Sequence, residues 1–281
     1  MWKKWIIIIV LAIAITPFTL FSWANDSAHM KATEAYLKRD YKAARDHATA
    51  AVEAEPKREE PRMLLGMACD KLRDQAAAVK AFTGVIEINP NSLRAYDSRG
   101  DANLKLGKFK DAVADFDKVL AMKPEIAPEH WRRGIALYYT GQHAEGVKQF
   151  ETHKRANPED VENAAWHYLC NVKVVGKEKA RADLIVVTRD SRVPMAEIQK
   201  LYAGKLQPAD VMAAAEKIPA DTDAGNEARF YANLYVALYY EAEGDAKKVV
   251  EHLTPAVQKY VISHYMWDIA NVHLELLKAK K

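Results

Sequence analysis

Glycine, phenylalanine and proline recur along the first half of the chain at a fixed spacing of 34 residues. The positions that keep this spacing are Gly66, Gly100 and Gly134, then Phe82, Phe116 and Phe150, and finally Pro56, Pro90, Pro124 and Pro158. Three residue types that share one period of this length indicate stacked helical repeats, because each repeat must bury its apolar face against the next.

Within one period the sequence predicts two helices joined by a turn. Residues 93–106 and 111–122 are rich in good helix formers. Gly107 lies between them and tolerates the positive φ that commonly ends a helix, while Pro124 prevents the second helix from continuing. Gly100 falls inside the first helix, where glycine costs about 1 kcal/mol relative to alanine. We therefore expect the partner helix to approach closely at that glycine.

These residues resemble the tetratricopeptide repeat, a 34-residue unit with small residues at positions 8 and 20, an aromatic at 24 and a proline at 32. In the repeat that starts at Leu93, these positions hold Gly100, Ala112, Phe116 and Pro124. The resemblance implies an all-α fold, a right-handed superhelix of stacked helix-turn-helix units, or α-solenoid. Its four repeats would cover residues 25–58, 59–92, 93–126 and 127–160.

After residue 160 the period loosens, although helical patterns continue. Residues 161–281 are expected to form divergent, repeat-like hairpins and a C-terminal capping helix that covers the last apolar face. The expected helices cover residues 161–174, 177–187, 194–203, 208–217 and 263–278, with a loop over 218–226 and a further hairpin that turns at Gly244 and Asp245.

The first 24 residues follow the pattern of a secretory signal peptide. Two lysines precede an uncharged apolar run over residues 6–15, and a small-x-Ala site ends at Ala24. The run is shorter than the roughly 20 residues that span a bilayer. We therefore predict a periplasmic or secreted protein of bacterial type, cleaved after Ala24. An uncleaved N-terminal anchor in the inner membrane is the alternative.

Motifs in the C-terminal half appear in the same order as in NlpI-like bacterial lipoproteins, which this chain resembles from about residue 127 onward. The motifs are HWRRGIALYYTGQ, ENAAWHYLC, LYAGKLQPADVM and RFYANLYVALYYEAEGD. This resemblance implies a non-catalytic adaptor, often dimeric, that brings cell-wall hydrolases to a processing protease. The chain departs from that family because no cysteine for lipidation follows its apolar run.

A concave groove is the expected binding site, since the resemblance to tetratricopeptide repeats implies that the first helix of each repeat lines it. The candidate groove residues for a peptide or protein are Asp97, Asp101, Lys105, Trp131, Ile135, Tyr138 and Tyr139. The aspartates would accept a basic side chain, and the aromatic residues would supply large contact area. A peptide with a basic and an apolar residue is the expected guest. The alternatives are aromatic residues packed between repeats and aspartates that face solvent.

No motif indicates catalysis, a metal site or a cofactor. The sequence has no His-Glu-x-x-His motif and no histidine-cysteine cluster at zinc spacing. We therefore predict no catalytic residue, no metal and no cofactor; a cell-wall enzyme or enzyme subunit with an unrecognised active site is the alternative function. His143 and His153 are expected to be exposed, and His167 to be a core histidine or a partner contact.

The charge balance and the cysteines complete the prediction. The formal net charge is +3 over 281 residues, with acidic and basic residues interleaved, so we expect no nucleic-acid partner. Cys69 and Cys170 are expected to be separate buried thiols. The sequence thus predicts an adaptor that binds proteins or peptides in the cell envelope, as a possible homodimer. A structural spacer in a larger assembly is a further alternative.

Overall fold

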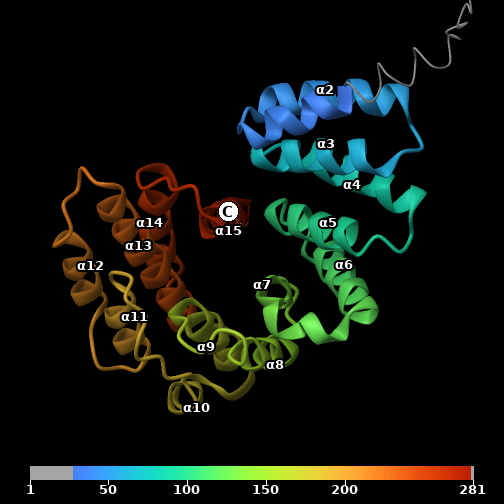
Figure 1. Ribbon diagram of the computed structural model, residues 1–281. Helices are drawn as coiled ribbons and strands as arrows, with labels where there is room; N and C mark the ends of the chain where they lie inside the picture. The colour runs from blue at the N-terminus through green and yellow to red at the C-terminus, as the bar shows by residue number, and fades with distance from the viewer. Residues whose placement is uncertain (1–27, 280–281) are drawn as a thin grey trace, which may run out of the picture. The chain divides into compact units, whose positions relative to one another are not determined.

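The computed structural model describes residues 28–279, and every regular element in that range is a helix (Figure 1). The chain divides into two compact units, Met1–Asn89 and Pro90–Lys281, called here the N-terminal and C-terminal units. The predicted signal or anchor, residues 1–24, lies outside the described residues. Within residues 28–279, no helix combines the length and apolar character needed to cross a membrane.

The N-terminal unit contains a helix over residues 28–37, followed by α2 (Tyr41–Ala54), α3 (Glu59–Lys71) and α4 (Gln75–Ile88). Its two hairpin turns share one design. Arg39 and Arg73 adopt positive φ values of 62° and 59°. The aspartate after each arginine then caps the next helix, as Asp40 does by accepting the backbone N–H of Ala43. The 34-residue period therefore extends to the turns, even where they lack glycine.

The C-terminal unit continues the helical hairpins and adds the divergent region. Its elements are α5 (Leu93–Lys105), α6 (Phe109–Met122), the short 3₁₀ helix η1 (Pro124–Glu129), α7 (Trp131–Tyr139), α8 (His143–His153), α9 (Val161–Val175), α10 (Lys177–Ala182), α11 (Met195–Tyr202), α12 (Pro208–Glu216), α13 (Asp223–Glu243), α14 (Ala246–Gln258) and α15 (Tyr265–Ala279). Gly107 and Gly244 adopt positive φ at the predicted turns, which confirms those two hairpins.

The repeated glycines sit where a phenylalanine ring of the partner helix meets the backbone. A Cβ atom on Gly66, Gly100 or Gly134 would lie 2.4, 2.8 or 2.6 Å from the ring of the phenylalanine sixteen residues later. Those three rings are fully buried. The close approach expected from the sequence is therefore confirmed, and it explains why the cost of a mid-helix glycine recurs in each repeat.

Two boundaries in the divergent region differ from prediction. The helix expected over residues 177–187 is wrong beyond Ala182, where α10 ends and an extended segment begins. The β-branched run after Leu184 favours extended backbone, and Glu159 accepts the backbone N–H groups of Thr188 and Arg189. The loop expected over 218–226 ends earlier, because the Thr222 hydroxyl caps α13 by accepting the N–H of Gly225.

The final helix forms where the sequence predicts it, but its packing was not expected. In the C-terminal unit α15 contacts α14 and also reaches α5, so it lies on the inner side of the arc that α5 to α14 form in Figure 1. A valine of α15, Val272, lies beside the α5–α6 turn at Gly107. The capping helix therefore covers part of the concave surface as well as the last hairpin. Cys69 and Cys170 are buried, unpaired thiols, as predicted.

Candidate protein-binding cavity

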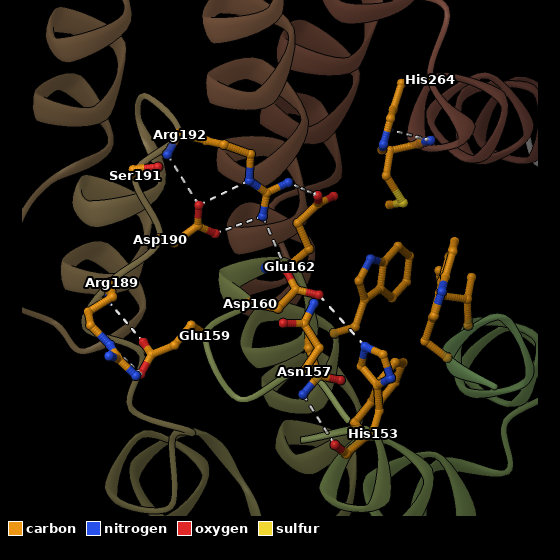
Figure 2. Close-up of a pocket in the computed structure, with 16 residues that line it drawn as sticks. His153, Asn157, Glu159, Asp160, Glu162, Arg189, Asp190, Ser191, Arg192 and His264 are labelled. Carbon is orange, nitrogen blue, oxygen red and sulfur yellow. Dashed lines mark hydrogen bonds and ion pairs between the residues drawn. The ribbon is translucent and has the colours of Figure 1, made fainter. Parts of the chain in front are cut away.

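A cavity of about 470 Å³ remains open on the concave side of the C-terminal unit (Figure 2). It lies among α7, α8, α9, the 189–192 loop and the start of α15. Its apolar lining comprises Trp131, Ile135, Phe150, Trp166 and Met266, and its charged lining comprises Glu159, Asp160, Glu162, Asp190, Arg189 and Arg192. We call this site the α7–α9 cavity.

Arg192 is the centre of the charged wall (Figure 2). Its Nε and Nη2 donate to Asp190 at 3.0 and 2.7 Å, Nη2 also donates to Asp160 at 3.2 Å, and Nη1 donates to Glu162. Burial lowers the pKa of Arg192, but Asp190 and Glu162 raise it more, so the guanidinium stays charged. This network ties the 189–192 loop to the start of α9.

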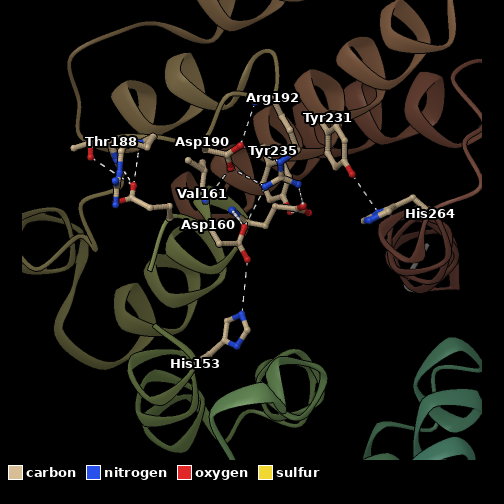
Figure 3. Close-up of polar contacts among 12 residues, drawn as sticks. His153, Asp160, Val161, Thr188, Asp190, Arg192, Tyr231, Tyr235 and His264 are labelled. Atoms are coloured by element: carbon tan, nitrogen blue, oxygen red, sulfur yellow. Dashed lines mark hydrogen bonds and ion pairs between the residues drawn. The ribbon is translucent and has the colours of Figure 1, made fainter. Parts of the chain in front are cut away.

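Glu162 is a further buried member of that network. Burial raises its pKa more than the neighbouring Arg192 lowers it. The hydroxyl of Tyr235, from α13, donates to the second oxygen of the same carboxylate. The wall therefore joins three elements that lie far apart in the sequence, namely the loop, α9 and α13 (Figure 3).

His153 closes the base of the wall (Figure 3). Its Nδ1 lies 2.6 Å from the carbonyl of Pro128, which can only accept, so Nδ1 carries a proton and donates. Its Nε2 lies 3.8 Å from Asp160. Burial lowers the pKa of His153, but Asp160 and the Pro128 carbonyl raise it further. The expectation that His153 is exposed is wrong, because the last turn of α8 packs against η1 and α9.

The wall carries more negative than positive charge. Four carboxylates line the cavity against two guanidinium groups, and Arg189 and Arg192 are both already paired with them. Burial raises the pKa of Asp160, but His153 and Arg192 lower it more, so this carboxylate is ionised. The α7–α9 cavity thus presents an aromatic base and an acidic wall.

The predicted groove residues fall into two groups. Trp131 and Ile135 line the α7–α9 cavity. Asp97 and Asp101 instead hold the chain's own cations: Arg132 donates to both oxygens of Asp97 at 2.8 and 2.9 Å, and Lys105 pairs with Asp101 at 2.8 Å. These aspartates are therefore engaged in internal ion pairs and are not simply solvated.

Tyr138 and Tyr139 pack between helices, as the alternative interpretation had it. The Tyr138 hydroxyl donates to Glu241 of α13 at 3.2 Å. The Tyr139 hydroxyl lies 2.9 Å from Nδ1 of His273 on α15, and its ring stacks on Phe109 with centroids 4.4 Å apart. Burial raises the pKa of Tyr139 well above its ordinary value. Tyr139 therefore belongs to the packing around α15, whereas Tyr138 packs against α9 and α13.

Tyr265 at the start of α15 covers the remaining groove positions. Its ring meets Trp131 edge to face at 4.9 Å between centroids, and the Lys105 ammonium lies 5.1 Å from the centre of the same ring. The groove predicted from α5 and α7 is thus closed by α15 at its α5 end. It stays open at the α7–α9 cavity.

The acidic wall was not predicted. Glu159 and Asp160 follow Pro158 in the turn before α9, and Arg192 ends the TRDSR stretch, which the sequence marks only as a polar break. The sequence feature that could have indicated this wall is an acidic turn followed, about thirty residues later, by a loop with two arginines. Nothing in the 34-residue period brings those two segments together.

Comparison with known proteins identifies the repeats. Residues 29–92 and 98–161 match the family model described as "Tetratricopeptide repeat", so the chain contains tetratricopeptide repeats. Such repeats generally form non-catalytic scaffolds for protein interaction. A curated relative, the protein SGT1 homolog of Bos taurus, is 30% identical over 98 residues. That match spans 35% of this chain and only 29% of the relative.

Solved structures give the same fold. A tetratricopeptide repeat protein from Parabacteroides merdae superimposes with a TM-score of 0.59 at 16% identity, covering 91% of this chain and 99% of that one. MamA from Desulfovibrio magneticus RS-1 gives 0.52 at 21% identity, covering 56% and 89%. At these identities the likeness shows a tetratricopeptide-like helical solenoid and no more.

Proposed function

We propose that this protein is a non-catalytic adaptor, and that the α7–α9 cavity holds a segment of a protein partner. The observation that carries the proposal is the cavity's combination of a tryptophan base with an acidic wall. Trp131, which is half-buried, offers a large, rigid apolar surface of the kind that commonly anchors protein interfaces, and the buried Trp166 packs behind the same cavity. The excess of carboxylates favours a basic residue of the guest. The preferred guest is therefore a peptide segment with neighbouring apolar and basic side chains.

The place of action that we propose is the bacterial cell envelope. The support is the signal-like pattern of residues 1–24, with release after Ala24 or retention in the inner membrane as its two outcomes. The NlpI-like order of motifs after residue 127 supports a role in linking cell-wall hydrolases to a protease. Homodimer formation rests on that resemblance as well.

The proposal is tested by affinity capture from a bacterial envelope fraction, with cell-wall hydrolases and proteases identified by mass spectrometry. Asn157→Arg is the informative variant, because this exposed side chain lines the cavity and the new cation would repel a basic guest. Val174→Ala, on the exposed face of α9, is the matched control. We expect Asn157→Arg to reduce capture at least tenfold and the control to leave it unchanged.

Two results would contradict the proposal. Equal capture by Asn157→Arg and the control, with unchanged thermal unfolding, would remove the cavity as the binding site. Cleavage of peptidoglycan or peptides by the purified chain alone would favour the enzyme alternative instead.

A further inference from the structure

The segment after α10 is an extended stretch in a chain whose described elements are otherwise helical. Residues 184–188 read Leu-Ile-Val-Val-Thr, and their side chains alternate after the first position: Ile185 and Val187 are buried, whereas Val186 is 69% exposed. Such alternation is the pattern of a strand with one buried face. β-branched residues favour this backbone.

No strand lies beside this segment within the part of the chain that the structure describes. The N–H groups of Ile185, Val186 and Val187 donate to no other residue within 28–279. At its ends the backbone is bonded: the N–H of Leu184 donates to the carbonyl of Arg181 at 3.4 Å, Gln199 donates to the carbonyl of Ile185 at 3.0 Å, and Glu159 accepts from Thr188 at 2.9 Å. The middle of the segment therefore presents unpaired peptide groups, as an exposed sheet edge does.

A second cleft, of about 610 Å³, runs beside this edge and shares only Asp190 with the lining of the α7–α9 cavity. Residues of the extended segment line one side, and α11 with the following turn lines the other. Three cations lie around it, Arg181, Lys200 and Lys205. Its one carboxylate, Asp190, is already neutralised by Arg192 at 2.7 Å. The cleft beside the edge is thus basic, whereas the α7–α9 cavity is acidic.

We propose that residues 184–188 form a docking edge for an extended segment of a protein partner, one that alternates aliphatic and acidic residues. The partner adds as a strand, its backbone pairing with Val186 and its carboxylates meeting Lys200 and Lys205. This surface is distinct from the α7–α9 cavity and selects guests of the opposite charge. An adaptor with two such sites holds two different partners at once.

The test uses a fluorescent heptapeptide that alternates valine and glutamate, added to the full chain. We expect saturable binding, together with slowed amide hydrogen exchange at Val186. The double variant Lys200→Glu with Lys205→Glu should weaken binding roughly tenfold, since each exposed ion pair contributes modestly. Lys118→Glu with Lys217→Glu, two exposed lysines outside the cleft, makes the same change in net charge and should leave binding within twofold.

Backbone pairing is tested separately. Val186→Pro removes the N–H donor and should abolish both binding and exchange protection, whereas Val186→Thr keeps the donor and should retain them. No binding by the valine–glutamate peptide, equal binding by its valine–lysine counterpart, or full binding by Val186→Pro would each overturn the proposal. Asn157→Arg should leave this binding unchanged, so failure here is distinguishable from failure at the α7–α9 cavity.

Discussion

The groove predicted along α5 and α7 of the C-terminal unit is covered at one end and open at the other. At the α5 end, Asp97 and Asp101 hold Arg132 and Lys105, and α15 lies across them. At the α7–α9 end, Trp131 faces a cavity whose wall is acidic. Both ends carry the carboxylates and aromatic groups expected of a peptide groove. The comparison shows that groove residues are accessible to a partner only where no distant segment of the chain, such as α15, packs against them.

The largest expected difference is in stability, between a variant that removes an arginine at the covered end and one that removes an arginine at the open end. Arg132→Ala should reduce the free energy of unfolding by about 2 kcal/mol, because it removes the guanidinium that pairs with both Asp97 and Asp101, two partly buried carboxylates. Lys105 and His130 stay beside them and keep the loss below that of an unpaired buried charge. Arg189→Ala should cost less than about 1 kcal/mol, since that side chain is 78% exposed. Urea unfolding of both variants measures the difference. Equal losses would mean that the α5 end is no more closed than the cavity.

A smaller effect separates two tyrosines at the closed end. Tyr139→Phe removes the hydrogen bond to His273 and should cost about 1 kcal/mol. Tyr265→Phe removes a buried hydroxyl that has no hydrogen-bond partner among the described residues, so stability should stay within about 0.5 kcal/mol or rise. Thermal unfolding compares the two. A larger loss of stability for Tyr265→Phe than for Tyr139→Phe would show that the Tyr265 hydroxyl stabilises the packing of α15 against α5 and α7.

The smallest effect is a pH dependence at the open end. The folded state raises the pKa of His153, so its contribution to stability is fully present below the unfolded value near 6.5 and is lost as pH rises through the folded value. The stability advantage of the natural chain over His153→Gln should therefore be larger at about pH 5.5 than at about pH 8. An advantage that grows with pH would contradict the assigned pair with Asp160.

Much of the fold could be predicted because the repeat is a local rule. The spacing of Gly100 and Phe116 fixes how two neighbouring helices pack, and Gly107 fixes the turn between them. The helix predicted over residues 177–187 was wrong after Ala182. Good helix formers precede that point, and only the β-branched run that follows it favoured an extended backbone. No local rule predicts that α15 returns to α5, because that contact joins residues more than 150 positions apart.

The candidate site shows the same limit. The repeat register predicted that Trp131 and Ile135 share one helix face, because helical spacing alone decides the face, and both line the α7–α9 cavity. The acidic wall depends on Arg192 meeting Asp160 and Glu162 across about thirty residues that include α9, α10 and the extended segment. Such pairing is a tertiary property, and the period that identified the repeats ends before it.

Site-specific cross-linking tests most directly whether partners use the open end of the groove. Both natural cysteines are buried, so a photoreactive maleimide would label an introduced cysteine selectively. Ser191→Cys places it at the mouth of the α7–α9 cavity, and Leu106→Cys places it in the exposed α5–α6 turn at the closed end. We predict that hydrolase or protease chains cross-link through position 191 and not through position 106. Cross-links through position 106 alone would contradict the account.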